Sequence, residues 1–263
     1  MPRILLTDLH DPRISEYREL NQRNLTRYSG LFIAEGDKVV ERLLESDHGV
    51  ESLLVEERFL PRFEALVPSE TPLYTGPQAL LEQIIGFNFH RGVLACGRRK
   101  PQPPLAEVAA RFPPRSLVVV CPDVQDPTNL GSIIRTSAAF GASAVLVGAN
   151  CADPFSRRVL RVSMGAAFRL PVVESRDLAA DLELLKNEIS FELIATVIDE
   201  RAEALAVAVR PERVALLLGG EGHGLSREWL NLATRQVTIP MQLGIDSLNV
   251  AVAAAIFLFH FQK

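Results

Sequence analysis

Two polar residues that could do chemistry follow the apolar run 117–121. Asn129 lies where a loop turns into a helical stretch, and Arg135 comes six residues later. A strand, a turn and a helix N-terminus present backbone N–H groups to anions. The two side chains lie roughly 120° apart around the helix axis, so only the length of the arginine would bring it to the loop. On spacing alone, a helix cap at Asn129 and a surface arginine are the simpler interpretation.

A glycine-rich segment, residues 219–224, follows a second apolar run, 214–218, and contains Glu221 and His223. Four glycines in six positions predict a tightly turned backbone. If the run is a strand, the turn lies at the carboxyl edge of a sheet, where open α/β folds bind ligands. The spacing is not GxGxxG, so a nicotinamide dinucleotide site is poorly supported. His223 could titrate near neutral pH, although an exposed loop residue is the simpler interpretation.

A third polar segment precedes the last apolar stretch of the chain. A predicted strand ends at Pro240, and a loop then leads to Ser247 and a predicted helix over 248–261. Ser247 occupies the position of a helix N-cap, which explains it without any chemistry. Asn249 would lie in the first turn of an apolar helix, where a buried amide without a partner costs stability. We therefore predict a polar cluster at this edge of the sheet.

Prolines divide the chain. Three of them fall within positions 101–104 and two more at 113–114, on either side of a short helical segment over 105–112. Proline cannot continue a helix or a central strand. We predict a first domain over residues 1–99, a proline-rich linker over 100–114 and a second domain over 115–263.

Strands and helices alternate in both predicted domains, which indicates a small α/β layered domain followed by a βαβ series with a mostly parallel sheet. The elements expected in the first domain are helices over 14–25 and 37–45 and strands over 32–33, 50–55 and 93–96. Those expected in the second are strands over 117–121, 144–147, 193–197, 214–218 and 237–239 and helices over 129–140, 156–164, 178–188 and 248–261.

The net charge of −4 over 263 residues gives the chain no overall field for nucleic acid. Any RNA site must therefore be a local basic patch. For each candidate patch, a solvated charged face remains the alternative. The candidates are Arg13 with Arg18, Arg23 and Arg27; Arg98 with Arg99 and Lys100; and Arg157 with Arg158 and Arg161.

Composition and cysteine usage predict a cytoplasmic protein without a membrane partner. The longest apolar run, 248–259, is shorter than the roughly 20 residues of a membrane span, and the first ten residues do not form a secretory leader. Cys96, Cys121 and Cys151 are well separated and form no CxxC pair. This pattern favours reduced thiols packed as small core residues, and no metal site.

Together, and in this order, the three polar segments resemble the signature of the SpoU (TrmH-like) family of RNA 2′-O-ribose methyltransferases, in the SPOUT superfamily. The resemblance covers most of 117–261, including the stretch 161–171. More loosely, residues 32–36 and 92–95 resemble the ribosomal-protein-like substrate-binding domain that is often fused to these enzymes. Gly220 departs from the pattern, because the family often has Asn there.

The resemblance implies an α/β fold whose C-terminal, mostly parallel sheet carries a deep trefoil knot. It also implies a homodimer with its site at the subunit interface, S-adenosylmethionine as cofactor and the 2′-hydroxyl of an RNA ribose as methyl acceptor. Ribosomal RNA is favoured over tRNA by the extra N-terminal domain. By position, the implied catalytic residues are Asn129, Arg135, Glu221, Ser247 and Asn249, and the implied cofactor-binding residues are Thr196, Gly219, Ile239 and Leu248.

Arg135 is often assigned as the base in this family, but a guanidinium stays protonated in proteins. We expect it to stabilise the developing alkoxide or to bind the adjacent phosphate. Asn129, Ser247 and Asn249 would orient the hydroxyl and Arg135, and Glu221 would fix the loop or Arg135. Two other functions stay open: a non-catalytic RNA-binding protein of the same fold, and an unrelated nucleotide-binding oxidoreductase.

Overall fold

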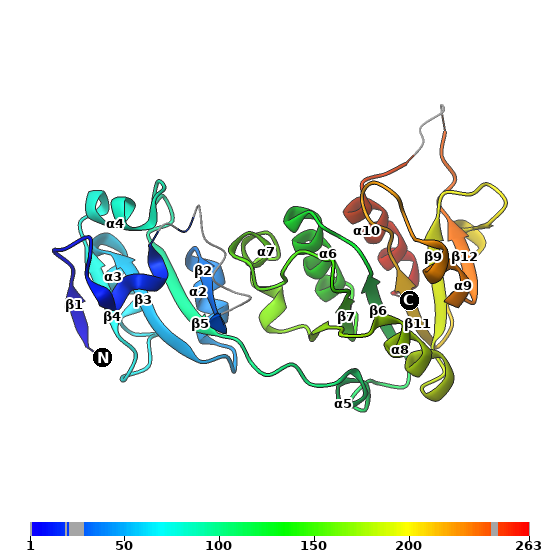
Figure 1. Ribbon diagram of the computed structural model, residues 1–263, viewed down its shortest axis with the longest axis horizontal. Helices are drawn as coiled ribbons and strands as arrows, with labels where there is room; N and C mark the ends of the chain where they lie inside the picture. The colour runs from blue at the N-terminus through cyan, green and yellow to red at the C-terminus, as the bar shows by residue number, and fades with distance from the viewer. Residues whose placement is uncertain (1, 19, 21–28, 243–246, 263) are drawn as a thin grey trace. The chain divides into compact units, whose positions relative to one another are not determined.

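The computed structural model describes residues 2–18, 20, 29–242 and 247–262 (Figure 1). Two compact units are present, Met1–Pro101 with Phe155–Phe168, and Gln102–Pro154 with Arg169–Lys263. The segment Phe155–Phe168 thus packs with the first unit, although the sequence on both sides of it belongs to the second. The sequence-based division into 1–99, 100–114 and 115–263 did not include this segment in the first domain.

The first unit is built on a five-stranded mixed sheet in the order β1-β4-β3-β5-β2. Its strands are β1 (Arg3–Leu5), β2 (Leu31–Glu35), β3 (Val50–Glu56), β4 (Leu73–Gly76) and β5 (Val93–Arg98). Its helices are α2 (Asp37–Leu44), α3 (Leu60–Phe63), α4 (Gln78–Ile85) and α7 (Arg157–Val162), with 3-10 turns at Pro12–Tyr17, Glu57–Phe59 and Ala166–Phe168.

The strands predicted around 32–33, 50–55 and 93–96 and the helix predicted over 37–45 are confirmed. The helix predicted from residue 14 is wrong at its start. A 3-10 helix, Pro12–Tyr17, occupies this part, and Ile14 inside it has non-helical backbone angles. The rest of that predicted helix falls largely on residues 19 and 21–28, which lie outside the described residues.

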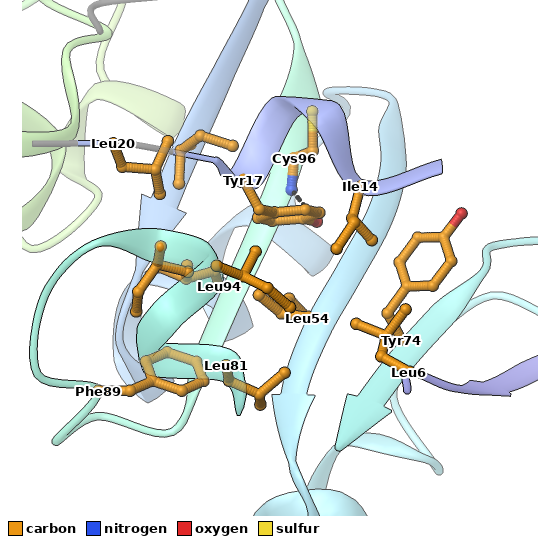
Figure 2. Packing of buried hydrophobic residues seen from close by; sticks show 13 residues of the cluster. Leu6, Ile14, Tyr17, Leu20, Leu54, Tyr74, Leu81, Phe89, Leu94 and Cys96 are labelled. Atoms are coloured by element: carbon orange, nitrogen blue, oxygen red, sulfur yellow. Dashed lines mark hydrogen bonds between the residues drawn. The ribbon is translucent and has the colours of Figure 1, made fainter. Parts of the chain in front are cut away.

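The apolar core of the first unit is arranged around Tyr17 (Figure 2). The Tyr17 ring is fully buried, and its hydroxyl donates to the Ser52 carbonyl at 2.9 Å and accepts from the Cys96 N–H at 3.0 Å. A buried hydroxyl is costly unless it is paired, so these two bonds allow the 3-10 segment to dock on β3 and β5.

The second unit is built on a seven-stranded sheet in the order β10-β12-β9-β11-β6-β7-β8. Its strands are β6 (Ser116–Cys121), β7 (Ala144–Val147), β8 (Val172–Glu174), β9 (Glu192–Val197), β10 (Glu203–Ala204), β11 (Arg213–Leu217) and β12 (Arg235–Thr238). Its helices are α5 (Leu105–Ala109), α6 (Pro127–Ala139), α8 (Leu178–Glu183), a π-helical turn (Leu184–Glu188), α9 (Arg227–Leu232) and α10 (Val250–Phe261), with a 3-10 turn at Leu205–Val207.

Every strand pair in the described part of this sheet is parallel, so the mostly parallel sheet predicted from the sequence is confirmed. The central strand β6 is buried along its whole length and β11 in all but its first residue, as expected when helices cover both faces. The predicted helix over 178–188 continues from α-helix into the π-turn. The short strands β8 and β10 and the helix α9 were not predicted.

The order of the strands reverses between β6 and β11. From β6 the chain continues through α6 to β7 on one side, and from β11 it continues to β12 on the other. In open α/β sheets, ligands bind outside the carboxyl ends of the strands at such a switch point. The loops after β6, β9, β11 and β12 are therefore the place to look for a site.

Candidate active site

A cavity of about 690 Å³ opens at the carboxyl edge of the second sheet. The ends of β9 and β12, the glycine loop after β11 and the start of α10 line it. Ligand pockets commonly measure about 300 to 1,000 Å³, so this one can hold a nucleoside-sized molecule. Seven of the nine residues implied by the family resemblance line it: Thr196, Gly219, Glu221, Ile239, Ser247, Leu248 and Asn249.

A row of three side chains crosses from the glycine loop to the last helix. The Asn129 Nδ2 donates to Glu221 Oε1 at 2.8 Å, and the Asn249 Nδ2 donates to Asn129 Oδ1 at 2.9 Å. Asn129 does not line the cavity itself, but it links two residues that do. The structure thus brings Asn129, Glu221 and Asn249 together.

Glu221 ties this row to the loop after β6. Its two carboxylate oxygens accept from the backbone N–H groups of Gln125 and Asp126 at 3.2 and 3.1 Å. Partial burial raises the pKa of the carboxyl, but the bonds from Asn129 and from backbone N–H groups outweigh burial and hold the pKa below its usual value. The charged carboxylate can only accept hydrogen bonds, and this fixes which way the Asn129 amide is turned.

Asn249 ends the row as the N-cap of α10. Its Oδ1 accepts from the N–H groups of Ala251 and Val252 at 2.9 and 3.3 Å. The prediction that Asn249 lies inside the helix and that Ser247 caps it is wrong, because the helix begins at Val250. The expected need of Asn249 for a partner is met twice, since its oxygen caps the helix and its nitrogen binds Asn129.

The cap of α6 also differs from the expectation. The N-cap is Asp126, whose carboxylate accepts from the N–H groups of Thr128 and Asn129, and Pro127 occupies the first turn. The interpretation of Asn129 as a helix cap is therefore wrong. Its side chain is left for Glu221 and Asn249.

Arg135 stands apart from this row. Its side chain is exposed on α6, it does not line the cavity, and it makes no hydrogen bond or ion pair with any residue that the structure describes. The contact between Glu221 and Arg135 that the sequence left open is absent among the described residues. Glu221 fixes the loop after β6 instead.

Comparison with known proteins shows which family this chain belongs to. A model of the SpoU rRNA methylase family matches residues 116–259, which is more than half of the chain. A protein of Mycobacterium bovis described as an uncharacterized tRNA/rRNA methyltransferase is 40% identical over 261 residues, covering 96% of this chain and 89% of that protein. The chain belongs to the SpoU rRNA methylase family.

Two further SpoU-family comparisons span nearly the full length. The Bacillus subtilis 23S rRNA (guanosine(2553)-2′-O)-methyltransferase RlmP is 29% identical over 253 residues, covering 94% of this chain and 95% of that protein. The AdoMet-bound rRNA methyltransferase from Sinorhizobium meliloti superposes with a TM-score of 0.84 at 25% identity, covering 99% of this chain and 97% of that one. A second model, for an MRM3-like substrate binding domain, matches residues 11–94.

The glycine that departs from the SpoU pattern has a local cause. A Cβ at Gly220 would come within 2.3 Å of the Asp123 carbonyl oxygen, and one at Gly219 within 2.6 Å of the Gly224 carbonyl carbon. Gly220 and Gly224 also bond each other's backbone in both directions at 3.2 Å. The loop therefore closes on itself so tightly that these two positions have no room for a side chain.

Several residues that line the SpoU-family cavity escaped the sequence analysis. Asp199 follows the end of β9 by two residues, so the rule that polar residues follow strand ends would have found it. Gln236 lies within β12 and gave no such signal. Ile198 lines the cavity and is 68% exposed, but an apolar residue is expected in the core when only the sequence is considered.

The three cysteines are buried and form no disulfide. Burial raises the pKa of Cys96 to about 12 and that of Cys151 to about 11, so neither thiol is an effective nucleophile near neutral pH. Within the described parts of the chain, no group of three or more His, Cys, Asp or Glu side chains is placed to hold a metal ion. The helices described there include none with the length and apolar character needed to cross a membrane.

Proposed function

We propose that this chain transfers a methyl group from S-adenosylmethionine to the 2′-hydroxyl of a ribose in RNA, with ribosomal RNA favoured over tRNA. The observation that carries the proposal is the Glu221–Asn129–Asn249 row beside a ligand-sized cavity at the switch point of the sheet. The names of the relatives support the reaction and the RNA class: RlmP is a 23S rRNA 2′-O-methyltransferase.

The cavity fits the proposed cofactor through backbone groups. Gly219, Ile239 and Leu248 line it, and no described residue is a hydrogen-bond partner for their main-chain N–H and C=O groups. These groups would hold the cofactor, and the Thr196 side chain, which donates to the Leu217 carbonyl at 3.0 Å, would shape the wall. When bound, S-adenosylmethionine supplies a methyl group activated by a positively charged sulfur, and it is bound in the related Sinorhizobium meliloti structure.

The side chains then have to orient the ribose. Asn129, Ser247 and Asn249 would hold the 2′-hydroxyl in line with the methyl group, since orientation supplies much of the rate when the leaving group is already activated. Glu221 keeps the Asn129 amide turned toward Asn249. Arg135 would stabilise the negative charge that develops as the hydroxyl proton leaves, or bind the adjacent phosphate.

We further propose that two copies form a dimer and that Arg135 acts in the partner's site. The α10 helix exposes an apolar stripe of Val252, Ile256 and Phe259, spaced three or four residues apart on one helical face. Phe259 also contacts Phe140, at the end of α6, so the stripe adjoins the helix that carries Arg135. Arg135 is not among the residues that line the cavity of its own chain, which supports a role across this interface.

Three further features complete the proposal: the topology of the chain, its cellular location and the role of the N-terminal domain. We propose a trefoil knot in the closing segment, which the position of β12 beside β9 rather than β11 supports. We propose a cytoplasmic protein, which the absence of disulfides among the three cysteines and the ribosomal substrate named for a relative support. We also propose that the N-terminal domain binds RNA, in keeping with the MRM3-like substrate binding domain that it matches.

The test is transfer of labelled methyl from S-adenosylmethionine to unmodified bacterial RNA, followed by digestion to nucleosides. Label in 2′-O-methyl nucleosides of the 23S fraction is the expected result. Label in the tRNA fraction would correct the substrate, and label on bases would overturn the ribose assignment. RNA binding without any label would favour the non-catalytic RNA-binding protein.

The cross-subunit role of Arg135 has its own test. Two variants expected to be slow, Arg135→Ala and Asn249→Asp, are co-expressed with different tags, and the mixed dimer is purified through both. If Arg135 acts in the partner's site, one of the two sites is intact and about half of the wild-type rate returns. If Arg135 acts in its own chain, both sites carry a defect and the mixed dimer stays as slow as the two variants.

A further inference from the structure

Three arginines surround one buried carboxylate in the first unit. Glu35, at the end of β2, has a side chain only 6% exposed. Arg157 Nη1 lies 2.7 Å from Glu35 Oε2, and Arg161 Nη1 and Arg91 Nε lie 3.5 and 3.7 Å from Oε1. One negative charge thus faces three positive charges. We call these four residues the Glu35 cluster.

Most of the guanidinium N–H groups in the Glu35 cluster make no hydrogen bond to a described residue. A guanidinium carries five N–H groups, and a single nitrogen of each arginine faces Glu35. Arg91, Arg157 and Arg161 have no other hydrogen-bond or ion-pair partner among the residues that the structure describes. The Arg91 and Arg161 side chains are also 48% and 39% exposed. The cluster is therefore open to a further anion.

The cluster is also fixed in place. The Arg157 guanidinium lies over the Phe87 ring, 4.3 Å from its centroid. Gly36 has a φ of 95°, which favours glycine, and a Cβ there would lie 3.0 Å from the Arg91 side chain and crowd it. Arg42 donates to the Met164 carbonyl just after α7. Groups held in their binding geometry lose little entropy when a ligand arrives.

In the other candidate basic patches, several side chains are paired with acids. Arg13 pairs with Asp11, Arg98 with Glu51 and Lys100 with Asp47. Arg23 and Arg27 lie outside the described residues. Around Arg157 and Arg161, a single carboxylate faces both guanidinium groups and that of Arg91, which comes from the other half of the sequence.

We propose that the Glu35 cluster binds backbone phosphates of the RNA substrate, with Glu35 as the positioning residue that spaces the three guanidinium groups. The proposal rests on the proposed function, because it assumes an RNA substrate. Guanidinium groups match phosphate oxygens in pairs, and such contacts set the register of an RNA without reading its sequence. The cluster joins β2 and the loop before β5 to α7, so RNA bound there spans segments from both halves of the sequence.

The test is the salt dependence of RNA binding by the full-length Arg91→Gln/Arg161→Gln variant. This variant keeps the Glu35–Arg157 pair and the stacking on Phe87, so the unit keeps its fold. The matched control is Arg3→Gln/Lys38→Gln, which also removes two positive charges from exposed ion pairs of the same unit. The probe is 23S rRNA transcribed in vitro, and Kd is measured between roughly 50 and 200 mM salt.

The expected result is a slope of log affinity against log salt that is shallower by about 1.4 to 1.8 in the cluster variant and unchanged in the control. Over that salt range the advantage of wild type then shrinks about tenfold. An equal slope in wild type and cluster variant would overturn the cluster proposal alone, provided that wild type methylates RNA. Wild type that neither binds nor methylates RNA would overturn the proposed function itself, and the cluster with it.

Discussion

Each unit of the molecule places a glutamate at the centre of a polar group, and the surroundings of the two carboxylates are opposite. Glu221 accepts only from an amide and from backbone N–H groups, and it is exposed beside the cavity. Glu35 is buried and faces three guanidinium groups. The first arrangement orients neutral amides, and the second holds excess positive charge in place.

The difference indicates a division of labour. Amides whose direction is fixed suit the orientation of a hydroxyl, which needs hydrogen bonds of known polarity. Spaced guanidinium groups suit phosphates, which need charge and allow some tolerance of position. The account therefore separates a row that acts on the chemical step from a cluster that acts on RNA affinity. The predictions below test that separation.

The largest effect is expected at Arg135, which would supply the positive charge that the Glu221–Asn129–Asn249 row lacks. Arg135→Ala should lower kcat by about 10² to 10³, because removing one donor that stabilises a developing anion typically costs that much. The thermal unfolding midpoint should stay unchanged, since the side chain is exposed and unpaired among the described residues. The measurement is methyl transfer under saturating RNA, with Arg3→Ala as the control. Turnover near that of wild type would refute the role in stabilising the developing anion, and an unchanged KM for RNA would refute the phosphate contact as well.

A smaller effect is expected at Glu35, and on stability. Glu35→Gln removes the charge that three arginines share and should destabilise the unit by about 2 kcal/mol. Hydrogen exchange should therefore quicken in peptides from β2 and α7, while peptides from α10 stay protected as in wild type. If all peptides exchange as in wild type, Glu35 does not organise the arginines.

Two substitutions at Asn249 can separate the effect of its bond to Asn129 from that of its cap on α10. Asn249→Asp keeps an N-cap oxygen for α10 but loses the N–H that bonds Asn129, so kcat should fall about tenfold or more with the unfolding midpoint nearly unchanged. Asn249→Ala loses both contacts and should cost about 1 kcal/mol of stability as well. Both variants are compared by turnover and thermal unfolding. Equal stability losses in the two variants would mean that the cap does not explain Asn249.

The smallest effect is the pH dependence at Glu221. Its folded pKa lies below the usual value of 4.5, so folding favours the charged form. The resulting stabilisation is fully present above about pH 4.5 and disappears as the pH falls through the folded pKa. The unfolding midpoint of wild type should exceed that of Glu221→Gln near neutral pH and converge with it in acid. A difference that stays constant with pH would contradict this account.

Much of the second unit could be predicted from the sequence, because buried parallel strands appear as apolar runs and the polar residues follow them. The need of Asn249 for a partner was also predictable. Its partner, Asn129, was not, since the two residues are 120 positions apart and only the strand order brings them together. Hydrophobic periodicity carries no such long-range information.

The first unit was predicted less well. The pairing of Glu35 with Arg157 joins residues 122 positions apart, and α7 lies within sequence that alternates strand and helix like the rest of the second unit. Nothing in the local pattern shows that this helix packs on another sheet. Glu35 and the glycine after it stood out only through a resemblance, and the buried ion pairs give them a physical reason.

The most direct test of the division of labour is steady-state methyl transfer by two variants measured in parallel, Asn249→Asp and Arg91→Gln/Arg161→Gln. The account predicts that the first lowers kcat with little change in the KM for RNA. It predicts that the second raises the KM for RNA and that this rise becomes smaller as the salt concentration increases. Two variants that change kcat and KM in the same proportion would contradict the separation of catalysis from RNA binding.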